Sequence, residues 1–214
     1  MSRITVIGGT GYAGSAIVAE AAGRGHQVTA LSRSAPEEPV PHVTYLQGDA
    51  GDEATLSWAI ADADVVVDAL APRGAQAGTW RDSHRAIARV ADATGVRLII
   101  VGGASSLRPA PGADRFVSDL SGIPEELHEE IREGAAFIIE DLPATPATLD
   151  WLFVSPALRF GAHLPAEQLG RYRLGDDVAV QSDGGVISAA DYALGLVDLV
   201  ETSDHHRAHL NLGH

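Results

Sequence analysis

Lysine and cysteine are both absent from this chain of 214 residues, and methionine occurs once, at position 1. Without lysine there is no Schiff base, no Walker-type phosphate-binding loop and no lysine general base. Without cysteine there is no disulfide framework, thiol nucleophile or cysteine zinc site. No apolar stretch approaches the roughly 18 residues that a membrane-spanning helix needs. These absences exclude several enzyme classes and predict a protein that does not cross a membrane.

The charge is strongly one-sided. All 15 basic residues are arginines, and 29 acidic residues bring the formal charge to −14. Residues 1–107 carry 8 arginines and 11 acids, whereas residues 108–214 carry 7 and 18. An acidic surface repels phosphate backbones and anionic headgroups, so we expect neither nucleic acid nor a membrane as partner. We expect a small-molecule substrate and a monomer or homodimer. The first apolar run breaks at Gly8, too early for a signal peptide, so the cytoplasm is the expected location.

Short apolar strands alternate with helices along the chain. The predicted strands cover residues 4–7, 27–31, 43–46, 64–70, 97–101, 151–154 and 209–212. The predicted helices cover residues 12–22, 52–60, 80–94, 124–140 and 188–201. This alternation predicts an α/β fold: a doubly wound, mostly parallel Rossmann-type sheet flanked by helices, in a single domain over residues 1–214. Loops at about 105–123 and 158–186 are expected to border a substrate cleft, the second with a small hairpin around Tyr172 and Val178.

The first strand–turn–helix carries a glycine motif, Gly8-Gly9-Thr10-Gly11-Tyr12-Ala13-Gly14. Backbone without side chains lets a pyrophosphate approach closely, and the N–H groups at the helix start attract its charge. Glycine is common in turns, so the motif alone is weak. Here a strand precedes it directly and a helix follows, which is the context that dinucleotide binding requires.

The end of the second strand bears on which dinucleotide binds. Binders of NAD usually carry an acid there for the ribose hydroxyls, whereas this chain has Ser32-Arg33-Ser34. An arginine can grip the 2′-phosphate of NADP with paired, charge-assisted hydrogen bonds. The alternative is a solvent-exposed arginine. Asp49, next to Ala50 after the third strand, would face the adenine amino group, or would be an ordinary turn residue. NADP is therefore the expected cofactor, with NAD possible.

At this point the chain resembles a known family. The glycine motif, Arg33, Gly48-Asp49, Val101-Gly102-Gly103-Ala104 and Val154-Ser155-Pro156-Ala157 resemble an atypical short-chain dehydrogenase/reductase. The resemblance is closer to the NAD(P)H-binding subgroup that is related to biliverdin IXβ/flavin reductases and NmrA-like proteins, and it spans essentially the whole chain. The cofactor-binding residues expected from the motif, the strand ends and this resemblance are Gly8, Thr10, Gly11, Tyr12, Ala13, Gly14, Ser32, Arg33, Asp49, Ala50, Leu70, Ala71, Arg73, Gly102, Gly103 and Pro156.

The chain departs from the wider superfamily in its catalytic residues. The usual pair is Tyr-x-x-x-Lys, in which the lysine lowers the tyrosine pKa for proton transfer. None of Tyr12, Tyr45, Tyr172 and Tyr192 has a lysine four residues later. Carbonyl reduction by that route and sugar-nucleotide epimerisation are therefore disfavoured. What remains is hydride transfer to an acceptor that needs little acid help, such as a flavin, quinone or conjugated tetrapyrrole.

Few polar residues are candidates beside the nicotinamide. Ser105 and Ser106 follow the fifth strand and could donate to a substrate, or cap a loop. Arg73 could cover the pyrophosphate, or lie free in its loop. His128, on the acidic helix where the superfamily carries its Tyr-Lys pair, could donate a proton or be a solvated surface residue.

Two functions stay open at this level. One is an NADP-preferring oxidoreductase, and the other is a non-catalytic NADP(H)-binding sensor or regulator.

His205, His206 and His209 suggest a metal, but their place near the terminus favours an exposed turn, so no metal site is expected.

Overall fold

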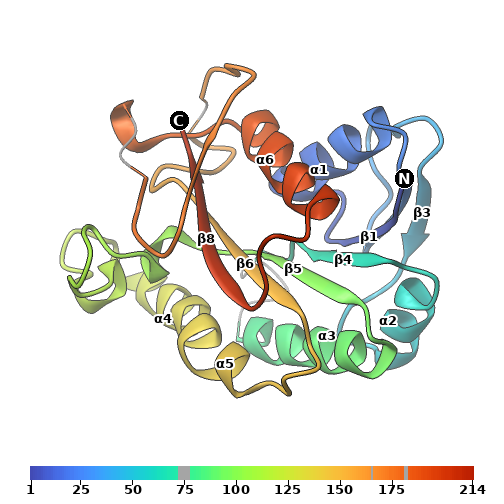
Figure 1. Ribbon diagram of the computed structural model, residues 1–214, viewed down its shortest axis with the longest axis horizontal. Helices are drawn as coiled ribbons and strands as arrows, with labels where there is room; N and C mark the ends of the chain where they lie inside the picture. Colours follow the sequence, from blue (N-terminus) through green and yellow to red (C-terminus); the bar gives the residue numbers. More distant parts are fainter. Residues whose placement is uncertain (72–77, 165, 181–182) are drawn as a thin grey trace.

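The computed structural model describes residues 1–71, 78–164, 166–180 and 183–214. Within these residues one sheet runs through the molecule in the order β3-β2-β1-β4-β5-β6-β8-β7 (Figure 1). Its strands are β1 (Arg3–Ile7), β2 (Gln27–Ser32), β3 (Thr44–Gln47), β4 (Val65–Asp68), β5 (Arg97–Val101), β6 (Trp151–Pro156), β7 (Arg173–Gly175) and β8 (Ala208–Gly213). Every neighbouring pair is parallel except β7 with β8. The predicted mostly parallel α/β sheet is confirmed.

Helices cover both faces of the sheet. On one face lie α1 (Tyr12–Gly23) and α6 (Ala189–Glu201), and on the other lie α2 (Glu53–Ile60), α3 (Trp80–Thr94), α4 (His128–Ala136) and α5 (Leu142–Ala144) (Figure 1). Strand β4 shows why its sequence is apolar throughout. Val65 and Val67 pack into the core under α1 and α6, while Val66 packs into the core under α2 and α3. A strand buried on both faces has no polar side to show.

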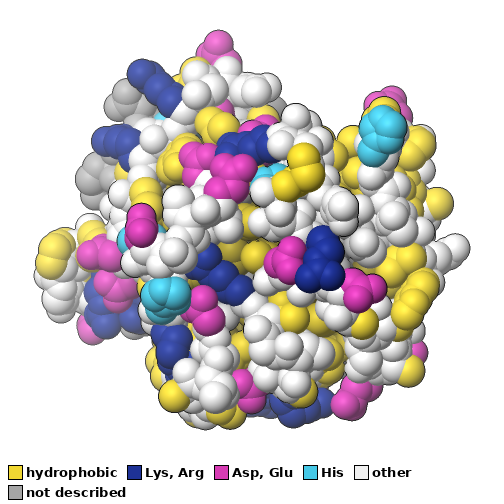
Figure 2. All heavy atoms as spheres, turned by 45° about the vertical axis from the view of Figure 1, so that its right-hand side comes forward, with side chains coloured by type: hydrophobic (Ala, Val, Ile, Leu, Met, Phe, Trp, Pro, Cys, Tyr) yellow, Lys and Arg dark blue, Asp and Glu magenta, His cyan; other side chains and the backbone are white. Residues whose placement is uncertain are grey.

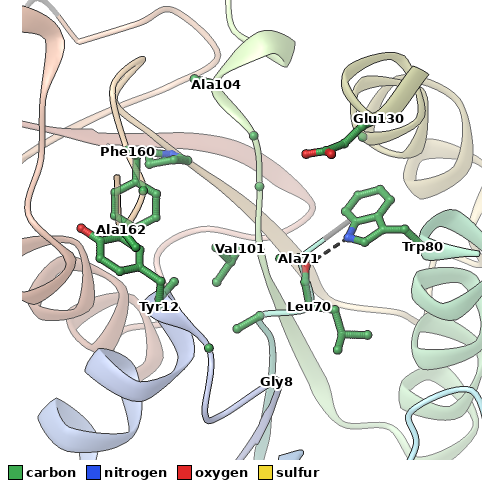
Figure 3. A pocket seen from close by; sticks show the side chains of 18 of the residues that line it. Gly8, Tyr12, Leu70, Ala71, Trp80, Val101, Ala104, Glu130, Phe160 and Ala162 are labelled. Carbon is green, nitrogen blue, oxygen red and sulfur yellow. Dashed lines mark hydrogen bonds between the residues drawn. The ribbon is translucent and has the colours of Figure 1, made fainter. Parts of the chain in front are cut away.

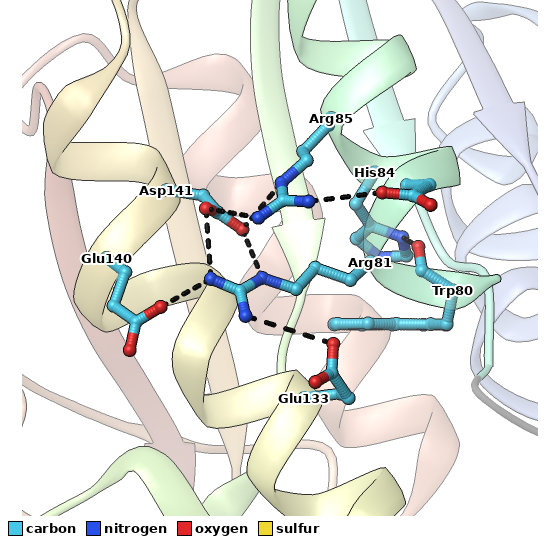
Figure 4. A network of polar contacts seen from close by, with 8 residues as sticks. Trp80, Arg81, His84, Arg85, Glu133, Glu140 and Asp141 are labelled. Atoms are coloured by element: carbon cyan, nitrogen blue, oxygen red, sulfur yellow. Dashed lines mark hydrogen bonds and ion pairs between the residues drawn. The ribbon is translucent and has the colours of Figure 1, made fainter. Parts of the chain in front are cut away.

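The acidic helix predicted over 124–140 is longer and less regular than expected. A 3₁₀ turn, η4 (Glu125–Leu127), leads into α4, and a π-helical segment, η5 (Phe137–Asp141), joins α4 to α5. Arginines from α3 hold this region in place (Figure 4). Arg81 lies 2.6 Å from Asp141 and 2.5 Å from Glu140, and Arg85 lies 3.0 Å from Asp141. These ion pairs fix the helical segment that begins with α4 against α3.

The hairpin predicted around Tyr172 and Val178 is wrong. Strand β7 pairs with the far edge of β8, and Val178 instead forms an isolated bridge with Arg108. The edge of β8 offers unpaired main-chain groups to β7. Asp177 adds ion pairs to Arg108 at 3.1 Å and to Arg115 at 3.0 Å. The two loops that the sequence assigned to one cleft are thus bound to each other.

Acidic and basic side chains are interspersed on the face shown in Figure 2, with apolar side chains between them. One such cluster joins α1 to α6, where Arg24 lies 2.6 Å from Asp198 and 2.8 Å from Glu201. Among the residues that the structure describes, no helix is both long and apolar enough to span a bilayer.

Candidate cofactor and acceptor site

A cavity of about 1050 Å³ opens at the carboxyl edge of the parallel sheet (Figure 3). The ends of β1, β2, β5 and β6 all reach it, through Ile7, Ser32, Val101 and Pro156. In open α/β sheets this edge is where ligands bind. Its volume lies at the upper end of the roughly 300–1,000 Å³ range for single small-molecule sites. The cavity therefore has space for a dinucleotide and a second ligand side by side.

The glycine turn forms the floor at one end of the cavity. Gly8 has a left-handed backbone, with φ of 80°, and a Cβ there would lie 2.8 Å from the carbonyl oxygen of Ala69. Gly11 stands immediately before α1 and has no side chain with which to cap the first N–H groups of the helix. Those N–H groups and the helix dipole are left for an anion.

Gly14 was expected to contact the cofactor, but it does not line the cavity. A Cβ on Gly14 would lie 2.1 Å from the carbonyl oxygen of Gly8. Its role is to let α1 pack against the turn. Gly102 combines both roles, since it lines the cavity and a Cβ there would lie 2.1 Å from the ring of Phe153.

At the adenosine end, Arg33 is exposed and lines the cavity, and its side chain makes no hydrogen bond or ion pair with a described residue. Ser32 also lines the cavity, but its hydroxyl accepts from Thr10 N at 3.1 Å and donates to Leu31 O at 2.8 Å. The serine therefore supports the turn. Asp49 is not among the residues that line the cavity, although its neighbours Gly48 and Ala50 are, and its Oδ1 accepts from Gly51 N at 2.8 Å. Its side chain therefore closes a local turn, and its contact with adenine stays a prediction.

At the other end, Gly102, Gly103 and Ser105 line the cavity beside Pro156. Ser106 was a catalytic candidate, yet it is 1% exposed and its hydroxyl donates to Gly103 O at 2.9 Å. The 3₁₀ turn η2 (Ala104–Ser106) rotates consecutive side chains apart, so of the two serines Ser105 lines the cavity and Ser106 does not.

Two aromatic walls enclose the space beyond this end. Tyr12 and Phe160 form one wall, with ring centroids 5.2 Å apart, and Trp80 stands opposite with Glu130 above it (Figure 3). Further lining residues are Phe116, Asp119, Leu120, Ile123, Ile131, Gly134 and Leu158. We call this space the acceptor compartment. Phe116, Asp119, Leu120, Ile123, Leu158 and Phe160 lie in the two loops that were expected to border a substrate cleft. The sequence did not point to the residues from α3 and α4, which are Trp80, Glu130, Ile131 and Gly134.

His128 does not reach the cavity. Its Nε2 lies 3.0 Å from Leu120 O and 2.9 Å from Ile123 O, and carbonyls only accept, so Nε2 must donate. The ring is half-buried and ties α4 to the loop that lines the acceptor compartment. His128 is therefore not a freely solvated residue, and among the described residues it is not one that lines the cavity where a substrate would take a proton.

The terminal histidines separate in space. His206 is exposed and pairs with Asp150 at 3.1 Å, whereas His209 lies on β8 with its Nε2 2.9 Å from Ser155 Oγ. The exposed-turn interpretation is therefore wrong for His209, because β8 carries it inward against Phe153. Burial lowers the pKa of His209 to about 4. The described residues contain no group of three or more potential metal ligands.

The structure brings most of the predicted cofactor residues together around the cavity. Those that line it are Gly8, Thr10, Gly11, Tyr12, Ala13, Ser32, Arg33, Ala50, Leu70, Ala71, Gly102, Gly103 and Pro156. Arg73 lies outside the described residues.

A family profile described as NAD(P)H-binding matches residues 8–203, which include the turn and both ends of the cavity. The chain belongs to the NAD(P)H-binding family. The residues present fit a nicotinamide dinucleotide, because the glycine turn leaves a side-chain-free cradle in front of the uncapped start of α1.

Three relatives of this NAD(P)H-binding protein show how far the likeness extends. "Uncharacterized protein YwnB" of Bacillus subtilis is 34% identical over 208 residues, which are 95% of this chain and 94% of the relative. A crystal structure from Bacteroides thetaiotaomicron, called a "putative epimerase", has a TM-score of 0.85 at 30% identity and covers 100% of this chain and 97% of its own. A structure from Streptococcus pneumoniae, called a "putative NADH-flavin reductase", has a TM-score of 0.82 at 29% identity, with 99% of both chains covered.

Proposed function

We propose that this protein is an NADPH-preferring oxidoreductase that transfers hydride to a planar, conjugated acceptor such as a flavin, a quinone or a tetrapyrrole. The observation that carries the proposal is the single cavity that continues from the glycine turn into the aromatic acceptor compartment. The cofactor would supply the hydride, and the chain would supply binding and orientation.

The walls of the acceptor compartment support a planar acceptor. Trp80 and the Tyr12–Phe160 pair present aromatic surfaces on opposite sides. A conjugated ring system held between them would lie beside the Gly102-Gly103 end, where the backbone leaves room for the nicotinamide. The effect is one of proximity and orientation, and it needs no covalent intermediate.

The polar groups in the compartment support an acceptor that takes its proton from water. Tyr12 is the tyrosine among the described lining residues, and no lysine exists in the chain to activate it. Glu130 and Gly134 line the cavity from α4, the helix on which the wider superfamily would carry its Tyr-Lys pair, and neither can replace that pair. This arrangement disfavours epimerisation as well as carbonyl reduction, although one relative carries the former name.

NADPH oxidation against a panel of flavins, quinones and aldehydes tests the proposal. We expect turnover with a flavin or quinone and none with simple aldehydes. The matched control is Gly11→Val. Its backbone, with φ of −75°, accepts a side chain, but the valine fills the phosphate cradle. We expect this variant to fold and to lose NADPH binding and turnover together.

Unchanged NADPH titration in the folded Gly11→Val variant would contradict the cofactor site. Tight NADPH binding with no oxidation by any acceptor would instead favour the sensor or regulator.

A further inference from the structure

Two buried ionisable side chains lie directly behind the acceptor compartment. Asp68 ends strand β4 and His84 lies on α3, and both are 0% exposed. Asp68 Oδ2 and His84 Nε2 lie 3.4 Å apart, and neither atom has a hydrogen-bond partner among the described residues. A buried polar atom without a partner is costly, so this pair calls for a physical explanation.

The pair belongs to a closed circuit of contacts. Leu70 N donates to Asp68 Oδ1 at 3.2 Å, and Trp80 Nε1 donates to Leu70 O at 3.0 Å. His84 Nδ1 lies 3.1 Å from Trp80 O, and His84 Nε2 returns the circuit to Asp68. The circuit joins the end of β4, the cavity-lining residue Leu70 and the first turn of α3.

The contacts restrict where the protons can be. Trp80 O is a carbonyl and can only accept, so His84 Nδ1 carries a hydrogen. In a neutral imidazole, Nε2 then presents a lone pair toward Asp68 Oδ2. Two acceptors would repel each other at this buried site, so one proton must lie between them, either on Oδ2 of a neutral acid or on Nε2 of an imidazolium. Oδ1 accepts from Leu70 N, which leaves Oδ2 as the oxygen that can carry the proton.

The circuit acts on the acceptor compartment through Trp80. The indole stacks on the His84 ring with centroids 3.8 Å apart, and it also contacts the Phe137 ring, with centroids 5.9 Å apart. Trp80 is 5% exposed, and that exposed part lines the cavity (Figures 3 and 4). Fixing His84 and Leu70 O therefore fixes the tryptophan that forms one wall.

We propose that Asp68 and His84 share one proton as a neutral pair and act as positioning residues that hold Trp80 as the wall of the acceptor compartment. This inference rests on the proposed function in one respect, which is that the acceptor binds against Trp80.

Burial supports this protonation state. It raises the pKa of Asp68 to about 7 and lowers the pKa of His84 to about 3. A group of six charged side chains lies on the elements packed against the pair: Arg81, Asp82 and Arg85 on α3 and Glu133, Glu140 and Asp141 on the facing helical segment. These six side chains pair with one another (Figure 4). Among the described residues, no other ionised side chain is a cause of either pKa shift.

The pair has little effect on how stability varies with pH, and this separates it from an ordinary buried carboxylate. The raised pKa of Asp68 removes stability as pH rises from 3.8 to about 7, while the lowered pKa of His84 adds stability from about 3 to 6.5. At pH 5 the folded chain holds the proton on Asp68 and the unfolded chain holds it on His84, so both states bind one proton. Loss of the shared proton is therefore expected to change the position of Trp80, and with it the acceptor KM, rather than the stability of the fold.

The first experiment reads the protons directly, by ¹⁵N NMR of the whole chain labelled at histidine. His84 is assigned by comparison with His84→Gln. At pH 5 to 6 we expect a neutral His84 with hydrogen on Nδ1 and a hydrogen-bonded, unprotonated Nε2. An imidazolium at pH 5, or a neutral ring with its hydrogen on Nε2, would overturn the proposal. This readout does not depend on any turnover.

The second experiment uses Asp68→Asn, which imitates the protonated acid. Its oxygen can accept from Leu70 N, and its NH₂ can donate to His84 Nε2. We expect the asparagine variant to keep the acceptor KM within about threefold, because it makes the same hydrogen bonds. In the native chain we expect the acceptor KM to rise above pH 7, where Asp68 loses its proton, and we expect the asparagine variant to lack this rise. Asp68→Leu should raise that KM by about tenfold while the NADPH Kd stays within about twofold, because the circuit meets the cofactor residues only through the backbone of Leu70, whereas it holds the whole indole of Trp80.

Asp64→Asn, just before the start of the same strand, is the matched control. Asp64 pairs with Arg3 on the surface, so its substitution should change neither constant. If Asp68→Asn raises the acceptor KM as much as Asp68→Leu does, the ionised carboxylate is needed. If Asp68→Leu changes the acceptor KM as little as Asp68→Asn does, the circuit does not position Trp80. Either result overturns the proposal. Should Asp68→Leu fail to fold, the asparagine pH profile and the NMR result still decide. If neither the native chain nor any variant shows turnover, the proposed function is contradicted. The NMR result then decides by itself whether Asp68 and His84 form a neutral pair.

Discussion

At the nucleotide end, the cavity wall is formed largely by one stretch of chain, Gly8 to Ala13, with Arg33 close by in sequence. At the acceptor end, the wall is made of side chains from α1, α3, α4 and two loops. A backbone cradle depends on the absence of side chains at a few positions, so single substitutions destroy it. An aromatic wall depends on many packed neighbours, so single substitutions reshape it. The two ends are therefore expected to respond very differently to mutation.

The largest expected effect is at Gly14. An alanine Cβ there would lie 2.1 Å from Gly8 O, and backbone atoms on both sides leave no way to relieve the contact without moving the turn. Overpacking of this kind costs about 1–3 kcal/mol of stability, and the displaced turn should weaken NADPH by more than about 100-fold, or 2.8 kcal/mol. Isothermal titration and thermal unfolding measure the two effects.

Gly23→Ala is the matched control on the same helix, because a Cβ at Gly23 would have no neighbour within 4 Å. It should leave NADPH affinity unchanged and stabilise the helix slightly, by up to about 1 kcal/mol. Equal NADPH affinity in Gly14→Ala and Gly23→Ala would break the distinction between a fragile nucleotide end and a tolerant acceptor end.

An intermediate effect is expected at Arg33. Hydrogen bonds to a charged group contribute about 1.5–3 kcal/mol. Arg33→Ala should therefore weaken NADPH by roughly 10- to 100-fold and leave NADH nearly unchanged, since NADH lacks the 2′-phosphate. Because Arg33 is exposed, the difference should shrink as salt is raised. Titrations of both cofactors at two salt concentrations test this, and equal weakening of the two would refute a phosphate contact.

The smallest effect is expected at His128, which supports the acceptor end from outside. His128→Ala removes the bonds to Leu120 O and Ile123 O and loosens two lining residues. Turnover should fall less than about tenfold, whereas loss of a general acid usually costs about 100-fold or more. Steady-state kinetics with saturating NADPH measure it. A loss of several hundredfold at intact cofactor affinity would make the histidine catalytic and contradict its distance from the cavity.

The nucleotide end was largely predictable from the sequence because its signals are local. The strand, the glycines and the helix start follow one another within 20 residues, and the chain has few ways to arrange them. The details that the sequence did not show are also local. Gly14 is a glycine because α1 packs against Gly8, and the Asp49 carboxylate accepts from Gly51 N.

The acceptor end could not be assembled from the sequence. Trp80 and Glu130 stand 50 positions apart and meet only because α3 and α4 lie side by side, joined by Arg81 and Asp141. The same holds for Asp68 and His84, which resemble a surface-type acid and an ordinary helix residue until the fold buries both.

The sequence by itself determined the parallel sheet, the glycine cradle and the absence of a Tyr-Lys pair. Hydrophobic periodicity and glycine spacing depend on residues that are close together in the chain, and composition does not depend on the order of residues at all. Only the tertiary structure decided which serine faces the cavity, where the aromatic walls stand and which acid and histidine share a proton. Each of these depends on desolvation and on distances between segments remote in sequence, and those quantities exist only once the helices have packed on the sheet.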